Sequence, residues 1–111
     1  MRALVSEFIG TSLLLTAVVG SGIMGDRLSG GNIAVALLAN SVATGAALVV
    51  LILAFGPISG AHFNPAVSLA DASQGGLSWT EASRYVGAQM AGAFVGVALA
   101  HLMFEIGRAH V

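Results

Sequence analysis

The residues best suited to chemistry lie in one short segment, Gly56-Pro-Ile-Ser-Gly-Ala-His-Phe-Asn-Pro-Ala-Val-Ser68. Asn64 is a favoured helix N-cap, and Pro65 suits the first position of a helix. A helix from Pro65 to about Ser73 would be only about 14 Å long, roughly half the thickness of a membrane's hydrocarbon core. The segment therefore predicts a loop followed by a half-helix that enters a membrane without crossing it.

Such a re-entrant loop would have a definite chemistry. Irregular backbone at membrane depth must lie within protein or line a water-filled cavity, because lipid offers it no hydrogen-bond partners. There, Gly60, Ala61 and His62 would present carbonyl acceptors, while Asn64 would present side-chain donors. The half-helix would direct the positive end of its dipole toward the same point. This predicts a pore centre that admits neutral hydrogen-bonding solutes and repels cations.

The rest of the chain has the composition of a membrane protein. Of its 111 residues, 57% are hydrophobic and only 8% are charged, which leaves too little polar surface for a soluble globule. Apolar stretches at about 3–24, 33–55 and 80–104 are each long enough to cross a bilayer as a helix. We therefore expect an all-α membrane protein with three transmembrane helices, a re-entrant loop and half-helix over about 56–74, and one domain over 1–105.

The first apolar stretch has an alternative interpretation as a signal peptide, since Arg2 precedes it and small residues follow at 20–22. Its apolar run is longer than the roughly 7–15 residues of a signal peptide, and it contains Glu7, which favours a retained helix. The glycines and charges of Gly25–Asn32 predict a short exposed connection to the next helix.

The third apolar stretch carries small residues at four-residue spacing: Ala88, Gly92, Gly96 and Ala100. On a helix these four share one face, where another helix can approach closely. The pattern predicts close helix packing without identifying the partner helix.

The loop around Asn64 resembles that of a known family. Ser59-Gly-Ala-His-Phe-Asn-Pro-Ala-Val67 is similar to the first Asn-Pro-Ala loop of aquaporins and glycerol facilitators, the major intrinsic proteins. Ser6–Thr11 and Tyr85–Ala93 resemble the family's first-helix and third-helix signatures. The resemblance implies a passive pore in which two inverted halves each contribute a half-helix that reaches the bilayer midplane. It also implies a homotetramer for the full-length protein.

The resemblance assigns roles within the loop. Asn64 becomes the pore-centre donor, Pro65 and Ala66 complete the motif, and the carbonyls of residues 60–62 form the acceptor ladder. Outside the loop, it makes Glu7 a buried carboxylate that braces the pore loop, as acidic residues in membrane helices usually face the protein interior. The alternative is that Glu7 lies near the interface and meets water.

Two further positions follow from the same resemblance. Gln89 supports the loop if its helix packs as in the family, and is an interfacial amide otherwise. Thr44, twenty residues before Asn64, falls on the position of the family's selectivity filter. Threonine is small, so the constriction could admit polyols or neutral metalloid hydroxides as well as water. The alternative is that Thr44 only bonds its own helix backbone.

Several function classes are disfavoured. Cysteine is absent, the formal net charge is −1, and there is no basic stripe that would bind nucleic acid. His62 could pair with Glu7 or Asp71 as a metal ligand or general base, but no metal-ligand spacing surrounds it. We therefore expect no enzyme activity, cofactor or metal.

The family's pore requires a second, inverted half with its own Asn-Pro-Ala loop and a filter arginine, and neither occurs in this sequence. We therefore expect a half-channel that does not conduct without the missing C-terminal half. The segment 106–111 departs from the family and resembles one translated frame of a sequencing adapter, so we interpret it as a non-native tail. A natural tail, with Arg108 and His110 at a membrane surface, is the alternative.

The rival function is a non-conducting three-helix membrane protein that acts in assembly, with the face of Gly92 and Gly96 binding partner helices. For location we expect an integral membrane protein of a bacterial inner membrane. Arg2 is the only basic residue before the first helix, and we place the N-terminus in the cytoplasm.

Overall fold

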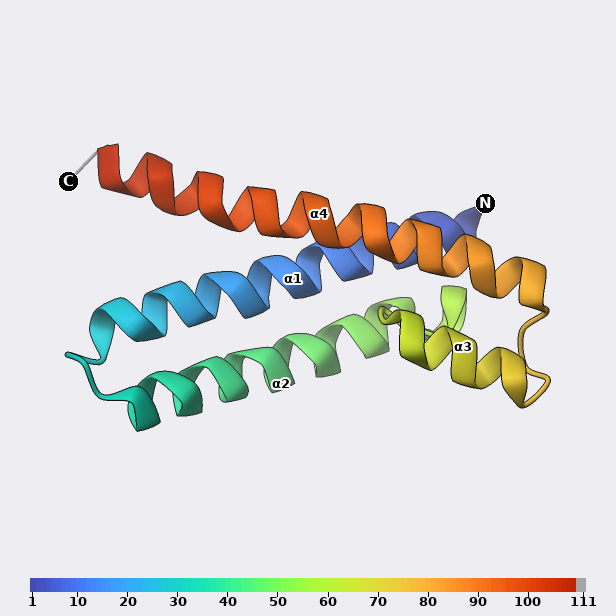
Figure 1. Cartoon of the computed structure of the whole chain (residues 1–111), viewed down its shortest axis with the longest axis horizontal. Helices are drawn as coiled ribbons and strands as arrows, with labels where there is room; N and C mark the ends of the chain where they lie inside the picture. Colours follow the sequence, from blue (N-terminus) through green and yellow to red (C-terminus); the bar gives the residue numbers. More distant parts are fainter. Residues whose placement is uncertain (110–111) are drawn as a thin grey trace.

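The computed structural model describes residues 1–109, the last four of them by backbone alone. Its helices are α1 (Arg2–Leu28), α2 (Ile33–Ser59), α3 (Pro65–Ser73) and α4 (Trp79–Ala109), and the described part contains no strand. α1, α2 and α4 run side by side along the 48 Å axis of the molecule, with α3 at the end where the N-terminus lies (Figure 1). Each long helix contains a span long and apolar enough to cross a membrane. The expected all-α membrane architecture is confirmed.

The connection between α1 and α2 is shorter than the sequence predicted. Residues 25–28, expected in an exposed turn, continue α1, so only residues 29–32 connect the two helices. Gly30 and Gly31 have φ angles of 63° and 88°, a region that glycine adopts without steric cost. Asn32 then caps α2, because its side chain accepts a hydrogen bond from the Val35 N–H at 3.1 Å.

The second helix also extends past its predicted end. Residues 56–59 were expected in the loop, but they form the last turn of α2, with Pro57 inside the helix. Past the first turn of a helix, proline removes one hydrogen bond and its ring crowds the carbonyl four residues earlier. After Pro57 the helix continues for only two more residues. The helix ends at Gly60, which has φ 87° and donates its N–H to the Gly56 carbonyl at 2.8 Å. The break therefore lies at residues 60–64, directly before α3.

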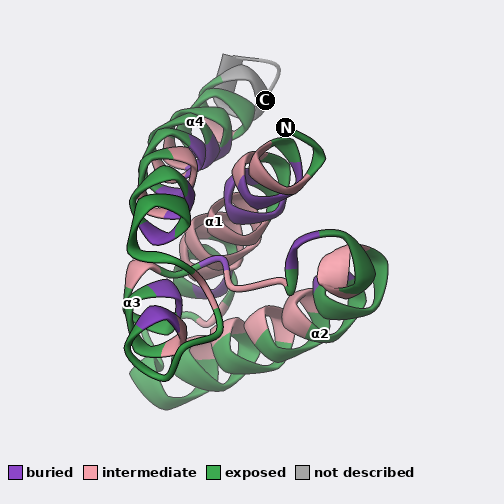
Figure 2. Cartoon of the chain, turned by 90° about the vertical axis from the view of Figure 1, so that its right-hand side faces the viewer, coloured by how far each residue is buried: buried purple, intermediate pink, exposed green. Residues whose placement is uncertain are grey.

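α1 is the central helix of the bundle. It packs against α4 on one side and α2 on the other, while α3 packs against α4. Figure 2 shows the buried residues on the facing sides of α1 and α4, on α3 and in the loop before it. α2 is exposed along most of its length, and its exposed apolar side chains include Leu37, Leu38, Val42, Val49, Val50 and Leu53.

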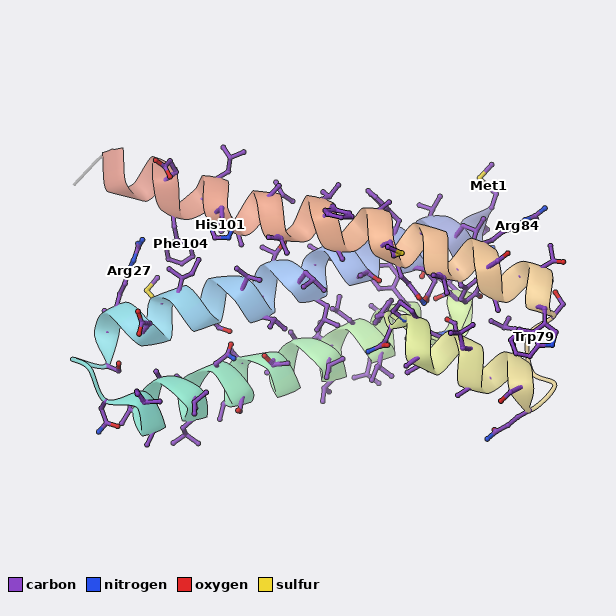
Figure 3. All side chains as sticks on the ribbon, in the orientation of Figure 1. Met1, Arg27, Trp79, Arg84, His101 and Phe104 are labelled. Atoms are coloured by element: carbon purple, nitrogen blue, oxygen red, sulfur yellow. The ribbon has the colours of Figure 1, made fainter. Side chains whose placement is uncertain are left out.

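Charged side chains gather at the two ends of the bundle. Arg84 lies with Met1 and Trp79 at one end, and Arg27 lies with Phe104 at the other (Figure 3). The Arg27 guanidinium carbon is 5.0 Å from the centroid of the Phe104 ring, within cation–π range. Among the described residues, the one buried acidic or basic side chain is that of Glu7. This distribution suits a chain whose middle lies in hydrocarbon.

The predicted non-native tail, 106–111, lies outside the residues whose side chains the structure describes. The backbone of α4 is helical to Ala109. The interpretation of these residues remains a sequence-based hypothesis.

Candidate functional site

The start of α3 is organised by Asn64 and Pro65. The Asn64 side-chain oxygen accepts a hydrogen bond from the Ala66 N–H at 2.8 Å, and Pro65 occupies the first turn. This is the N-cap that the sequence predicts. Because Oδ1 is used inside the helix, the two N–H donors of the Asn64 amide are left for an external acceptor. Asn64 is exposed in this chain, so those donors are accessible.

The loop before Asn64 has an unusual backbone. Gly60, Ala61 and Phe63 have φ angles of 87°, 52° and 55°. The left-handed region costs glycine nothing but costs other residues free energy, so the conformation at Ala61 and Phe63 must be held by surrounding contacts. Those contacts come from α1, through Glu7 and Gly10, and from α2, through Phe55 and Ser59.

Glu7 on α1 supplies the main contact. Its side chain is fully buried, and its carboxylate receives four hydrogen bonds. Two come from the backbone N–H groups of His62, at 3.3 Å, and Phe63, at 2.9 Å. The others come from the Ser59 hydroxyl, at 2.5 Å, and the Gln89 amide, at 2.7 Å. A buried carboxylate is tolerated when its oxygens are satisfied in this way. Glu7 thus joins α1 to α2, α4 and the loop.

Gln89 extends this network from α4 to α3. Its amide nitrogen donates to Glu7 and also to the Ser68 hydroxyl at 2.9 Å. Ser68 is fully buried and lies 2.9 Å from Nδ1 of His62. Gln89 is 1% exposed, so it is an internal residue of this chain and not an interfacial amide.

His62 is held on several sides. One contact is the hydrogen bond between Nδ1 and Ser68 described above. The ring also packs at a tilt against Tyr85, with ring centroids 5.3 Å apart, and Nε2 lies 4.0 Å from a carboxylate oxygen of Asp71. The part of the chain that the structure describes contains no group of three His, Cys, Asp or Glu residues that could hold a metal ion. The surroundings of His62 are those of a residue fixed by packing and hydrogen bonds.

Thr44 is the predicted site residue that the structure does not bring to the loop. It is half-buried on α2, and no residue of α2 comes within 8 Å of α3, measured between Cα atoms. Its hydroxyl forms no hydrogen bond with its own helix or with any other residue that the structure describes. The Thr44 hydroxyl is therefore without a hydrogen-bond partner among the described residues.

The small-residue strip of α4 faces α1. A methyl group on Gly92 would collide with the carbonyl oxygen of Phe8, and one on Gly96 would collide with that of Ser12. Thr16 adds a hydrogen bond from its hydroxyl to the Gly96 carbonyl at 3.2 Å. The outer members of the strip also lie inward, because Ala100 is fully buried and Ala88 half-buried. The partner helix of the strip is α1 of the same chain.

Three members of the site were not predicted from the sequence. Ser59 donates to Glu7 and accepts from Ser6 at 3.1 Å, and Tyr85 donates to the Ser59 carbonyl at 2.9 Å. Ser68 connects Gln89 to His62. One signal was present, because Tyr85 and Gln89 are four residues apart and so share a helix face. The two serines gave no comparable signal.

Comparison with known proteins extends the resemblance seen in the loop. Residues 1–110 match the family model described as Major intrinsic protein. Aquaglyceroporin AqpS of Rhizobium meliloti (strain 1021) is 58% identical over 105 residues, which are 95% of this chain and 45% of the relative. Aquaporin-9 of Homo sapiens is 43% identical over 94 residues (84% and 31%), and Probable aquaporin NIP7-1 of Arabidopsis thaliana is 40% identical over 93 residues (84% and 33%).

The chain spans less than half the length of these relatives. The family match nevertheless covers nearly all of this chain, including the three membrane-length helices and the half-helix that begins after Asn64. We conclude that the chain belongs to the major intrinsic protein family, the family of the aquaporins.

Proposed function

We propose that this chain forms one half of a passive transmembrane channel for water and small uncharged solutes such as polyols or metalloid hydroxides. The observation that carries the proposal is the hydrogen bonding and exposure of the Asn64 side chain. Its oxygen caps α3 and its two N–H donors are free and exposed at the N-terminus of that helix. A fixed donor beside the positive end of a helix dipole favours neutral acceptors and disfavours cations.

The proposed pore needs a second half, which we propose is a C-terminal segment with its own half-helix. The exposure of Asn64 and of the apolar surface of α2 supports this, since both would gain a partner in a complete channel. We further propose that the complete channel is a homotetramer in a bacterial inner membrane, with the N-terminus in the cytoplasm. The name of the rhizobial relative, an aquaglyceroporin, supports a solute range wider than water.

The rival function, a non-conducting assembly protein, has less support. It would use the face of Gly92 and Gly96 to bind partner helices, but α1 of the same chain packs there, against the carbonyls of Phe8 and Ser12. A face already in contact with α1 is not free for another helix.

Swelling of proteoliposomes tests the proposal. Two samples would be reconstituted: the chain alone, and a joined protein in which the chain is fused to the second half of the rhizobial aquaglyceroporin. We expect flux of water and glycerol only from the joined protein. Flux from neither protein, with both correctly inserted, would contradict the channel proposal.

Asn64→Asp in the joined protein tests the pore centre. The change replaces an amide donor by a carboxylate beside the helix N-terminus, so cation exclusion should weaken. Current across a planar bilayer, measured over a range of pH, reports the leak. Wild-type solute flux and wild-type leak at every pH would show that Asn64 is not at the constriction.

Thr44→Phe in the same protein tests the proposed filter. A larger side chain should narrow the constriction and reduce glycerol flux more than water flux. Val42→Phe, on an exposed position of the same helix, is the matched control. An unchanged ratio of the two fluxes in Thr44→Phe would remove Thr44 from the filter.

A further inference from the structure

The residue directly before Asn64 is attached to α1 at two points. The Phe63 N–H donates to the Glu7 carboxylate at 2.9 Å, and the Phe63 ring lies against Gly10. Glu7 and Gly10 are three residues apart, so they lie on the same face of α1. One face of one helix therefore holds both the main chain and the side chain of Phe63.

The contact with Gly10 is too close for any larger residue. A methyl carbon placed on Gly10 would overlap three carbons of the Phe63 ring, the farthest of them only 2.8 Å away. The ring has little freedom to yield, because Phe63 is 4% exposed and packs edge-on against Phe55, with centroids 6.2 Å apart. An alanine at position 10 would have to displace the ring by roughly 1.5–2 Å to reach ordinary carbon–carbon separation.

The backbone conformation of Phe63 depends on this attachment to α1. Its φ of 55° is unfavourable for a residue with a side chain, so the conformation depends on the contacts that hold it. Asn64 follows at once and begins α3. Because Phe63 and Asn64 are adjacent in the chain, a movement of Phe63 also moves the Asn64 amide.

We infer that Gly10 and Phe63 form a positioning pair, in which the space left by Gly10 receives the Phe63 ring and so fixes the depth at which Asn64 stands. Neither residue needs to touch a solute. The effect on flux rests on the proposed function, whereas the effect on the loop does not.

Amide hydrogen exchange of the 111-residue chain in detergent micelles tests the pair directly. Gly10→Ala should displace Phe63 from Glu7, and the Phe63 N–H should exchange at least tenfold faster. In Gly10→Ala/Phe63→Leu the smaller side chain makes room for the added methyl group, so protection should return to within about threefold of wild type. Gly45→Ala, with no atom within 4 Å of the new carbon, is the matched control and should leave the exchange unchanged.

Two results would overturn the inference: full protection of the Phe63 N–H in Gly10→Ala, or failure of the double variant to regain it. If Gly10→Ala does not fold, the double variant decides alone, because it should fold and be protected only if the overlap with the ring was the fault.

Flux through the completed channel then separates the two proposals. Gly10→Ala should reduce glycerol flux about tenfold and alter its ratio to water flux, and the double variant should restore both. A wild-type protein that conducts nothing would contradict the proposed function and leave the exchange result standing. Normal flux and ratio in Gly10→Ala, together with rapid Phe63 exchange, would show that the pair does not control Asn64.

Discussion

The interface between α1 and α4 is packed differently from the outer surface of α2. At the α1–α4 interface, glycines bring the backbones together and polar side chains are buried. Glu7 and the Gln89 amide nitrogen have hydrogen-bond partners there, whereas Thr11 Oγ1 and Gln89 Oε1 have none among the described residues. On α2 most apolar side chains remain exposed, and Leu51 and Ser59 are the buried residues of that helix. Between membrane helices there is little hydrophobic drive, so small residues and polar contacts decide which helices associate. The comparison indicates that α1 and α4 form the internal scaffold, while α2 has a surface suited to lipid or to another part of a larger protein.

The largest expected effect is at Glu7. Glu7→Leu removes the acceptor of four buried hydrogen bonds and should lower the free energy of unfolding by roughly 3–6 kcal/mol. Unfolding of the chain from detergent micelles by SDS, followed by circular dichroism, measures it. The control Glu81→Leu changes an exposed carboxylate and should cost at most about 1 kcal/mol. Equal costs for the two variants would mean that the Glu7 network does not hold the scaffold together.

Two glycine substitutions on α4 test whether the backbones of α1 and α4 are in close contact. Gly92→Ala places a methyl group against the Phe8 carbonyl and should cost about 1–3 kcal/mol through overpacking. Gly87→Ala, five residues earlier and with open space around it, should stabilise the helix by roughly 0.5–1 kcal/mol. The same unfolding experiment compares them. If both substitutions stabilise the chain, the helices are not in close contact at Gly92.

Tyr85→Phe probes one polar contact of the scaffold. The change removes the hydroxyl that donates to the Ser59 carbonyl at 2.9 Å and should cost about 1 kcal/mol. Ser83→Ala removes an exposed hydrogen bond within the same helix and should cost almost nothing. A neutral Tyr85→Phe would show that another donor, such as water, replaces the hydroxyl.

The smallest effect is expected on α2. Leu53 is 75% exposed, so Leu53→Ala should change the unfolding free energy of this chain by no more than about 0.5 kcal/mol. Leu51→Ala, at a buried position of the same helix, should cost about 2 kcal/mol. A large effect of Leu53→Ala in the isolated chain would mean that copies of the chain associate through α2.

Much of the fold followed from the sequence because the controlling signals are local. Apolar length predicts the three long helices, and Asn64-Pro65 predicts the start of α3 at the residue where it begins. The helix ends were less predictable. Gly25 and Pro57 looked like helix breakers, yet both are helical, because Gly30, Gly31 and Gly60 provide the left-handed conformations at which the chain turns.

Hydropathy and capping act over a few residues, so the residue pattern alone predicts a membrane protein with a short helix that begins after Asn64. The family resemblance pointed to Glu7 and Gln89 as supports of the loop, but the complete set of residues that hold that helix in place is visible in the tertiary structure alone. Glu7, Ser59, Ser68 and Gln89 are up to 82 residues apart along the chain, and their hydrogen bonds exist only after all four helices have packed. The same is true of Gly10, whose missing side chain has meaning only when the Phe63 ring lies against it. Such contacts depend on the relative placement of distant helices, which no local pattern of residues records.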